Sequence, residues 1–595
     1  MLKKNHKYTL NSSKYLLKEY FPLFIILVCH SFLLNAYYPL TGIDVGYYSS
    51  RLLDLLLHFK NEGIFKTQWW TPSYGAGIPG FPSPVHYQYS LTPYLLLLFS
   101  PWVSTVLTYL IFNSLGYALI LNYVKNHLEM RSDIATLAAL VFSTSGFWIC
   151  HSLVGHLSYH TFTLISVVPY ILSSKWSTNR QIVIFSLTII YMIHSGAFFP
   201  IYLTYLSLVQ LLFFFMILNK VDLKKLSKVI FFSHLVIITV SISKLTAVSL
   251  HMDVIPRLNS YSTWQNYAIA FPFANFFQLF SWRFLFPIES LLPIPADSIL
   301  FWICGSRYEF WENDVSVSPV VLPILLMFCY KFKQKIKLIV QKKKIIFILM
   351  IVTFWISAEI SIGKGIFWEI MKNLPVIKST HVNVRYCSSI ILFLTILTSL
   401  CHFHITKKMN DGKRSAFFYS TISISIFSML SYSFMIKQKK AFMSYDHTLE
   451  SEIWSEIKDG NTMAPITKIV KTKQNDHLSH FQRNATLHMP HDPLYGYHGH
   501  YFLPATKLGK TDSIDSEGFF NFHDPFSFYY PKDKSGARFK IPSYDFINFN
   551  LFINRKQPNW NLPAIQVIAN YITFISIILF CIYVFILTFR KVINK

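Results

Sequence analysis

Acidic residues and cysteines are both scarce in this chain. Its 595 residues include 29 Asp and Glu against 54 Lys and Arg, which gives a formal net charge of +25. The seven cysteines are scattered, so neither a disulfide framework nor a Cys-x-x-Cys metal site is predicted. The histidine-rich run HMPHDPLYGYHGH has no cysteine beside it and matches no standard zinc spacing. No repeat of fixed period is present, which argues against a solenoid.

Apolar residues are abundant instead. The chain is 52% hydrophobic and 17% aromatic, and its mean hydropathy is positive. A water-soluble globule of this length could not bury so much apolar surface, so the composition predicts a polytopic membrane protein.

About twelve apolar stretches are candidates for membrane spans, each of which needs about 20 residues. They are Tyr20–Leu40, Trp102–Val124, Ile134–Cys150, Thr161–Ser173, Ile182–Phe198, Ile201–Leu218, Val229–Leu250, Pro319–Tyr330, Ile345–Ile362, Cys387–Phe403, Ala416–Ile436 and Ile565–Phe589. Thr161–Ser173 and Pro319–Tyr330 are the shortest. No cleavage site follows the first apolar run, so we expect it to remain as a span.

Lysine and arginine gather in alternate connections. These are the basic start of the chain, KNHLEMR, KWSTNR, KVDLKKLSK, KFKQKIKLIVQKKK, HITKKMNDGKR and the final RKVINK. Because basic connections stay on the cytoplasmic side, both termini are predicted to be cytoplasmic. The net charge then reflects topology, with some attraction to anionic headgroups, and does not indicate nucleic-acid binding.

The predicted outer segments divide the chain. Residues 1–436 form the transmembrane module, with outer loops at 41–101, 251–318 and 363–386. Residues 437–562 lack a 20-residue apolar run and contain alternating stretches such as ARFKIPSYDFINFNLF, which indicate strands. We therefore expect an all-α membrane protein of about twelve helices with a smaller mixed α/β or β-rich extracytoplasmic domain. Residues 563–595 supply the last helix and tail.

Asp44 lies just after the first span, in YYPLTGIDVGYY. The following GYYSSRLLDLLLHF, in which Arg51, Asp54 and His58 supply polarity, is typical of a helix lying along the membrane interface. Asp44 could serve only as the N-cap of a helix beginning at Val45. That role and a catalytic one are compatible.

The order of these features resembles the GT-C superfamily of polytopic glycosyltransferases, in particular its bacterial, mostly uncharacterised branch. The resemblance covers the membrane part in outline. It rests on short motifs: Asp44, Trp69–Pro79 (WWTPSYGAGIP), His156 in VGH, Pro256-Arg257, Glu312 in WEND, and Arg385-Tyr386.

The resemblance implies a sugar donor on polyprenyl phosphate and a glycan, lipid or protein acceptor in the bacterial envelope. An acceptor hydroxyl would attack the anomeric carbon while lipid phosphate departs. Asp44 could take the proton, or it could hold a divalent cation such as Mg²⁺ or Mn²⁺ against the phosphate.

The departing phosphate needs positive charge. Arg257, Arg307 and Arg385 are the candidates, because a guanidinium binds phosphate oxygens in a bidentate manner. Arg385 stands out because a charge at the outer end of a span opposes the usual orientation rule. The alternative for Arg257 and Arg385 is that they reach only to lipid headgroups.

The other candidates have structural alternatives too. Glu312, with Glu309 and Asp314, could contact a metal or the acceptor, or could lie in a solvated loop. His156, with His151 and His160, could bind sugar or phosphate, or could pack at the interface. Trp69 and Trp70 could stack on a sugar, or could belong to the aromatic belt of the membrane.

The sequence therefore predicts a glycosyltransferase of the bacterial plasma membrane that works at its outer face. A transporter or flippase of lipid-linked sugars has a similar number of spans but usually carries polar residues near the bilayer midplane. The clearest charged residues in the predicted spans, Lys244 and Glu359, instead lie toward their outer ends. A non-catalytic envelope scaffold is the third alternative.

Overall fold

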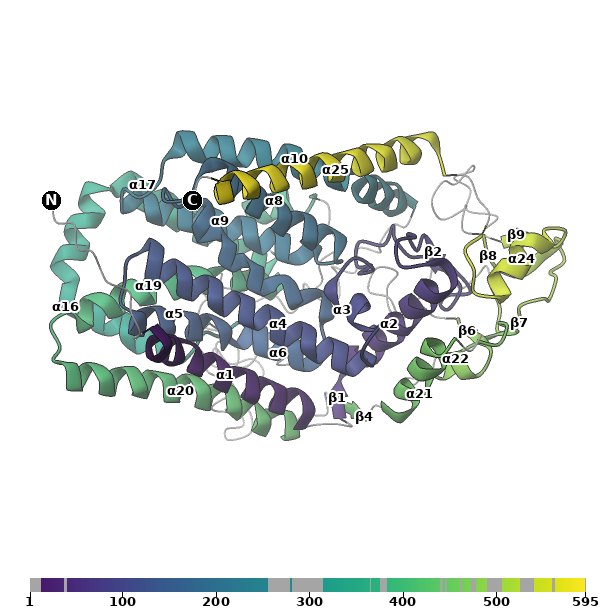
Figure 1. Ribbon diagram of the computed structural model, residues 1–595, viewed down its shortest axis with the longest axis horizontal. Coiled ribbons are helices and arrows are strands. Elements are labelled where there is room, and N and C mark those ends of the chain that lie inside the picture. Colours follow the sequence, from purple (N-terminus) through teal and green to yellow (C-terminus); the bar gives the residue numbers. More distant parts are fainter. Residues whose placement is uncertain are drawn as a thin grey trace.

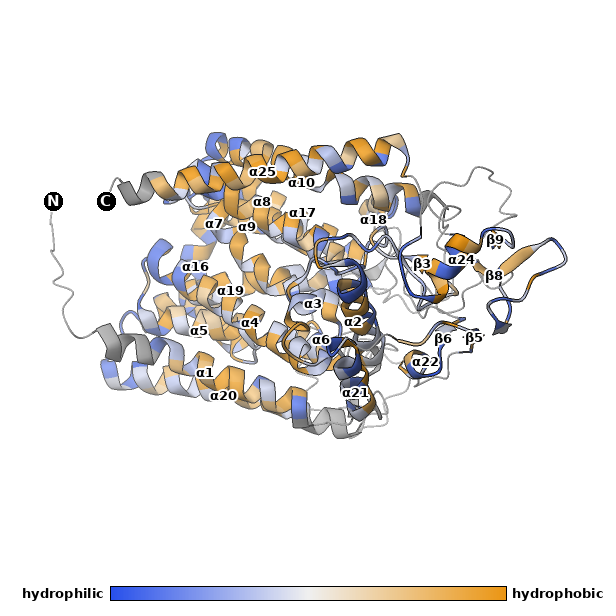
Figure 2. Cartoon of the chain, turned by 45° about the vertical axis from the view of Figure 1, so that its right-hand side comes forward, coloured by the Kyte–Doolittle hydropathy of each residue, from blue (hydrophilic) through white to orange (hydrophobic). Residues whose placement is uncertain are grey.

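Helices form an elongated bundle, and short strands gather at one end of it (Figure 1). The computed structural model describes residues 12–36, 40–254, 279–280, 314–363, 365–374, 383–438, 442–444, 447–460, 463–471, 478–488, 506–524, 540–558 and 562–593. In Figure 2, apolar residues cover the helices along the bundle, whereas hydrophilic residues gather toward its two ends.

Seven helical segments in the described part of the chain are long and apolar enough to cross a membrane, which confirms a helical membrane protein. They are Pro101–His127 (α4, Pro101–Asn122, with the π-helix η1, Tyr123–His127), Ser132–Val154 (α5, Ser132–Ser143, with α6, Gly146–Val154), Phe198–Ile217 (α9), Leu223–His251 (in α10, Leu223–Val254), Lys344–Ser361 (in α17, Lys344–Ile362), Asn383–Thr406 (the 3-10 helix η5, Asn383–Ser388, with α19, Ser389–Thr406) and Ala564–Phe589 (in α25, Ala564–Ile593).

About twelve membrane spans were expected, but only seven helical segments in the described part of the chain have the length and hydropathy that a span needs. The other five predicted spans fall on helices that are shorter, interrupted or more polar. These are α1 (Ser12–Ala36), the 3-10 helix η2 (Leu157–Val167) with α7 (Val168–Ile171), α8 (Thr178–His194), α16 (Val321–Lys342) and α20 (Asp411–Gln438).

The basic connections meet at one end of the bundle, which we call the basic end. Lys175 donates to the carbonyl of Asn126 at 2.8 Å, and Lys225 donates to the carbonyl of Trp176. Arg131 reaches Thr406 Oγ1 at 3.0 Å, while Lys343 reaches Asn219 Oδ1 at 2.9 Å. Contacts among the five internal basic connections show that these lie together at one end of the bundle, in line with the charge pattern.

The opposite end, which we call the loop end, holds the strands and short helices. Its elements are β1 (Leu40–Gly42), α2 (Ile43–Glu62), β2 (Trp70–Thr71), β3 (Ile78–Pro79), α3 (Leu91–Leu95), α18 (Ile366–Met371), β4 (Phe442–Ser444), α21 (His447–Lys458), β5 (Lys468–Val470), α22 (Ser479–Gln482), β6 (Ala485–Leu487), β7 (Gly509–Lys510), β8 (Phe519–His523), β9 (Lys540–Pro542) and α24 (Phe546–Ile553). The pairs β1–β4, β2–β3, β5–β7 and β8–β9 are antiparallel, and β5–β6 is parallel.

The stretch ARFKIPSYDFINFNLF is only partly a strand, contrary to the prediction. Its second half is α24, because Asp545 caps the helix by accepting from the backbone N–H of Asn548 at 3.1 Å. Phe549 and Phe552 then recur at helical spacing, and both pack against Phe522, Phe552 stacked on its ring and Phe549 tilted against it. In a short apolar run, periodicity alone does not distinguish a strand from a helix.

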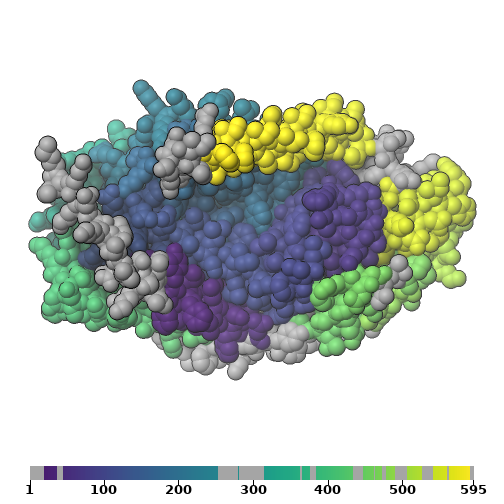
Figure 3. Space-filling view, viewed as in Figure 1, coloured from purple at the N-terminus to yellow at the C-terminus, as the bar shows by residue number. Residues whose placement is uncertain are grey.

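The first loop is built into the segment between β5 and α24. Ala76 is fully buried in a small core with Ile466, Ile469, Phe520, Phe522, Ile541 and Phe552. The backbone of Ala76 bonds to Leu487 and to His523. In Figure 3 the first loop (purple) adjoins both the green and the yellow parts of this segment. Residues 442–558 therefore share their core with a loop almost 400 residues earlier in the chain.

We expect Gly77→Ala to destabilise the protein more than Gly63→Ala does. Both glycines have positive φ, +105° and +99°, so alanine costs about 1 kcal/mol of backbone strain at either position. A Cβ at Gly77 would also overlap the indole ring of Trp70, whereas Gly63 faces open space. Overpacking adds about 1–3 kcal/mol. Equal thermal unfolding temperatures of the two purified variants would contradict this account.

Candidate functional site

Helix α2 is buried on nearly every side and is not the interfacial helix predicted from its pattern. Leu53, Asp54 and His58 are all at most 5% exposed. Residues 66–88 fold back over the polar side of the helix, where His58 Nε2 pairs with the carbonyl of Lys66 at 2.7 Å. Polar residues on this helix thus face protein groups and a small pocket.

A chain of hydrogen bonds, the Asp54 network, crosses this region. It consists of Arg555, Ser73, Asp54, Gln68 and His86. Arg555 Nη1 donates to Ser73 Oγ at 3.0 Å, and Ser73 Oγ donates to Asp54 Oδ1 at 2.5 Å. Gln68 Nε2 donates to Asp54 Oδ2 at 2.9 Å, and its Oε1 lies 2.9 Å from His86 Nε2. Since that oxygen can only accept, His86 carries its proton on Nε2.

Burial sets the protonation of this network. It lowers the pKa of Arg555 to about 10, against the opposing influence of Asp54, so the guanidinium stays charged at neutral pH. Burial, followed by the positive charge of Lys244, holds the pKa of His86 well below its usual range, so the imidazole is neutral. Burial also raises the pKa of the Tyr74 phenol.

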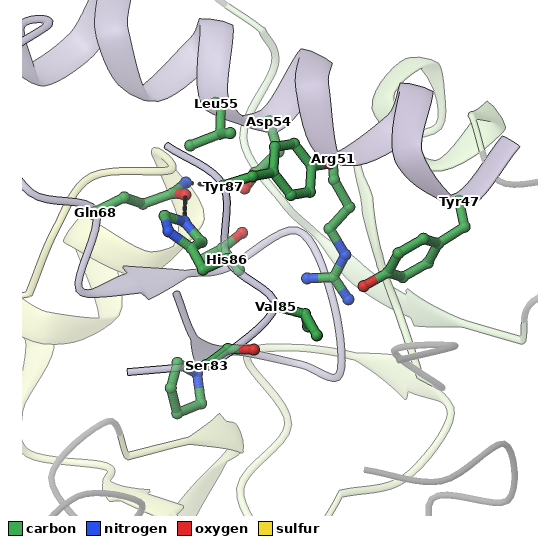
Figure 4. Close-up of a pocket in the computed structure, with 11 residues that line it drawn as sticks. Tyr47, Arg51, Asp54, Leu55, Gln68, Ser83, Val85, His86 and Tyr87 are labelled. Atoms are coloured by element: carbon green, nitrogen blue, oxygen red, sulfur yellow. Dashed lines mark hydrogen bonds between the residues drawn. The ribbon is translucent and has the colours of Figure 1, made fainter. Parts of the chain in front are cut away.

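The network borders a small pocket, partly open to solvent, with space for roughly one ordered water molecule. Its lining comes from α2 and from the loop that covers it: Tyr47, Arg51, Asp54, Leu55, Gln68, Thr71, Pro79, Ser83, Val85, His86 and Tyr87. Figure 4 shows the Arg51 guanidinium and the Tyr47 hydroxyl on one side, with Asp54, Gln68 and His86 on the other. Hydroxyl, amide and charged groups around so small a cavity suit an ordered water or a single hydroxyl group of a ligand.

A second group, the Tyr159 cluster, joins two of the predicted site residues with their neighbours. It consists of His151, His156, Tyr159 and Arg385. Arg385 Nη1 donates to the Tyr159 hydroxyl at 2.6 Å. The ring of Tyr159 lies 4.7 Å from that of His151 and 5.7 Å from that of His156, between centroids. His156 and Arg385 are thus brought together from different helices.

The start of α2 packs against this cluster. Gly155, with φ +89°, has no side chain, and a Cβ there would lie 2.9 Å from the backbone N of Val45. Tyr48 continues the contact through its hydroxyl, 3.0 Å from Ser158 Oγ. The first turn of α2 therefore adjoins His156.

Asp44 is the second residue of α2, since the helix begins at Ile43. It is thus inside the first turn and is not the N-cap of a helix beginning at Val45. A carboxylate in this turn is favoured by the helix dipole. The side chain of Asp44 lies outside what the structure describes, as do Arg257, Arg307, Glu309 and Glu312.

The tryptophans and Asp314 have packing roles. Trp70 is 1% exposed beneath Gly77, which leaves no face of its indole for a sugar, contrary to the prediction. Trp69 is half-buried and packs edge-on against Phe81 at 5.0 Å. Asp314 is buried rather than solvated, because it accepts from Tyr432 and from Ser316.

The two clearest charges in the predicted spans have hydrogen-bond partners within the protein. Lys244 donates to the carbonyls of Phe81 and Ser83 at 2.5 and 2.9 Å. Glu359 accepts from Trp355 Nε1 and from the backbone N–H of Phe367. Lys244 thus ties α10 to the first loop, and Glu359 ties the end of α17 to α18.

Among the described residues, no three His, Cys, Asp or Glu side chains lie close enough together to hold a metal ion. Comparisons with protein-family models, curated proteins and solved structures find no match to this chain. The resemblance to the GT-C superfamily therefore stays a prediction, and function must be argued from the site.

Proposed function

We propose that the chain is a membrane glycosyltransferase that moves a sugar from polyprenyl phosphate to a hydroxyl of an envelope acceptor. The observation that carries the proposal is the packing of Val45 against Gly155. It brings the helix turn that contains position 44 beside the Tyr159 cluster, which includes Arg385, and this proximity of two candidate residues supports the proposal.

In the proposed reaction, the acceptor oxygen attacks the anomeric carbon and forms the new glycosidic bond. The bond from that carbon to the phosphate oxygen breaks, and its electron pair leaves with the lipid phosphate. The acceptor proton passes to Asp44, or a divalent cation at Asp44 lowers the pKa of the hydroxyl. Arg385 balances the charge of the phosphate. The pocket beside Arg51 and Asp54 would receive a single hydroxyl of the sugar.

We also propose that twelve segments cross a bacterial plasma membrane, with the basic end and both termini cytoplasmic. Residues 437–562 and the site would then face outward. The shortest segment, η2 with α7, has 11 and 4 residues. Because a 3-10 helix rises about 2.0 Å per residue and an α-helix 1.5 Å, this segment extends about 28 Å, close to the bilayer core.

The test uses the full-length protein in proteoliposomes with radiolabelled polyprenyl-phosphate sugars and acceptors extracted from the native envelope. We expect label to appear in the acceptor and polyprenyl phosphate to be released. If the labelled sugar moves to the other leaflet but stays attached to polyprenyl phosphate, the protein is a flippase and the proposal is wrong. If label neither moves nor transfers for any donor, the enzymatic proposal fails and a scaffold is favoured.

A further inference from the structure

Helix α16 changes direction at the basic end. Phe332 has non-helical dihedral angles, φ −119° and ψ 20°, and this kink divides the helix. Figure 1 shows α16 running across the left-hand end of the bundle, at a steep angle to α4 and α5. The first half follows the bundle, and residues 332–343 make up the part beyond the kink.

Both ends of this second half are fixed to the basic end. The ring of Phe332 lies 6.0 Å from that of His404, near the end of α19. Lys343 Nζ donates to Asn219 Oδ1, in the connection between α9 and α10. A segment held at both ends to connections on one face of a bundle lies along that face. In a membrane protein, such a segment is parallel to the bilayer surface.

The sequence of this segment is amphipathic and carries only positive charge. Residues 331–344 read KFKQKIKLIVQKKK, with seven lysines and no acidic residue. On a helix of 3.6 residues per turn, Phe332, Ile336 and Val340 fall on one stripe. Lys333 and Lys337 flank that stripe on one side, and Lys331 and Lys335 flank it on the other. Apolar residues bounded by lysines are typical of a helix at a lipid interface.

The surface of this segment is also open. Lys333, Lys335 and Lys337 are exposed, and Leu338 and Ile339 are 55% and 47% exposed. Exposed aliphatic side chains therefore alternate with lysines, and the segment itself contains no acidic residue that could pair with them. Anionic phospholipids match both features, because their phosphates pair with lysine and their acyl chains cover apolar side chains.

We propose that residues 332–343 form a binding site for anionic phospholipid headgroups on the face of the membrane that carries the basic end. This role is separate from sugar transfer, which we place at the opposite end. The site would anchor the connection between α16 and α17 at the surface and would give the protein a shell enriched in anionic lipid.

The experiment measures binding of fluorescent phosphatidylglycerol and phosphatidylcholine to the full-length protein in detergent. The test variant is Lys333→Gln/Lys335→Gln/Lys337→Gln. Its matched control is Lys407→Gln/Lys408→Gln/Lys413→Gln, which removes three exposed lysines from the same end of the bundle. A third variant, Lys333→Arg/Lys335→Arg/Lys337→Arg, preserves the charge and checks that side-chain replacement alone has no effect.

We expect the wild type to prefer phosphatidylglycerol and the test variant to lose roughly 10–100-fold in affinity for it, since each lysine near an anionic surface contributes a severalfold factor. The control and the arginine variant should stay within about threefold of the wild type, and added salt should weaken binding. Equal losses in test and control variants, or a wild type without lipid preference, would overturn the proposal.

Discussion

Replacing Asp44 by asparagine is expected to lower the rate of sugar transfer by about 10²–10⁴-fold, the usual contribution of a positioned acid or base. Asparagine keeps the size of the side chain but can neither take a proton at neutral pH nor bind a hard cation well. The assay is the proteoliposome transfer described above, measured at saturating donor, so that loss of chemistry is separated from loss of donor binding.

The matched control for this variant is Asp512→Asn. Asp512 is an exposed carboxylate at the loop end, so its loss removes the same charge without touching the proposed site. Chelation separates the two roles of Asp44. If EDTA stops wild-type transfer and Mg²⁺ or Mn²⁺ restores it, Asp44 acts through a cation; if EDTA has no effect, it acts as a base. Transfer by the Asp44→Asn variant at the wild-type rate would remove Asp44 from the mechanism.

Replacing Arg555 by methionine is expected to destabilise the loop end by about 1.5–3 kcal/mol, the usual contribution of hydrogen bonds that involve a charged group, because it removes the buried guanidinium that donates to Ser73, the partner of Asp54. Arg555 also binds the carbonyl of Ala485 at 3.2 Å, so the variant loses a contact within the segment between β5 and α24. Limited proteolysis of the full-length protein reports this opening, because cleavage follows the population of locally open states. Lys556→Met, at the exposed neighbouring position, is the control.

The double variant Asp54→Asn/Arg555→Met makes this test specific. In the double variant, position 54 no longer carries a buried negative charge that depends on Arg555. The double variant should therefore resist proteolysis better than Arg555→Met alone. Additive losses would mean that Asp54 and Arg555 do not interact, which would contradict the account of the network.

Sequence patterns located the helices well, because span length and the placement of lysine follow from the physics of the bilayer and act locally along the chain. They misjudged α2. Its leucines and intervening polar residues fit an interfacial helix, yet a loop that begins four residues after the helix covers the polar side. Local periodicity cannot reveal what a later segment will cover.

The candidate site was predicted only in part for the same reason. His156 and Arg385 were singled out individually, and the structure brings them together around Tyr159. The sequence around Arg555 did not indicate a role in the site, because Ser73 and Asp54, to which Arg555 is linked, are almost 500 residues away. Gly75, Ala76 and Gly77 all have positive φ, and nothing in their sequence reveals the distant strands that receive this turn.

The insertion of Ala76 into a core made by residues 466–552 constrains the order of biosynthesis. Translation proceeds at about 5–20 residues per second, so the first loop emerges roughly half a minute or more before its last partner strand is made. During that interval the apolar turn around Ala76 lacks the side chains that bury it in the finished protein. Early termination of the chain, or removal of the late segment, would therefore leave this turn exposed and destabilise the protein. Chaperone or insertase contacts with nascent chains should therefore persist at this turn until synthesis is nearly complete.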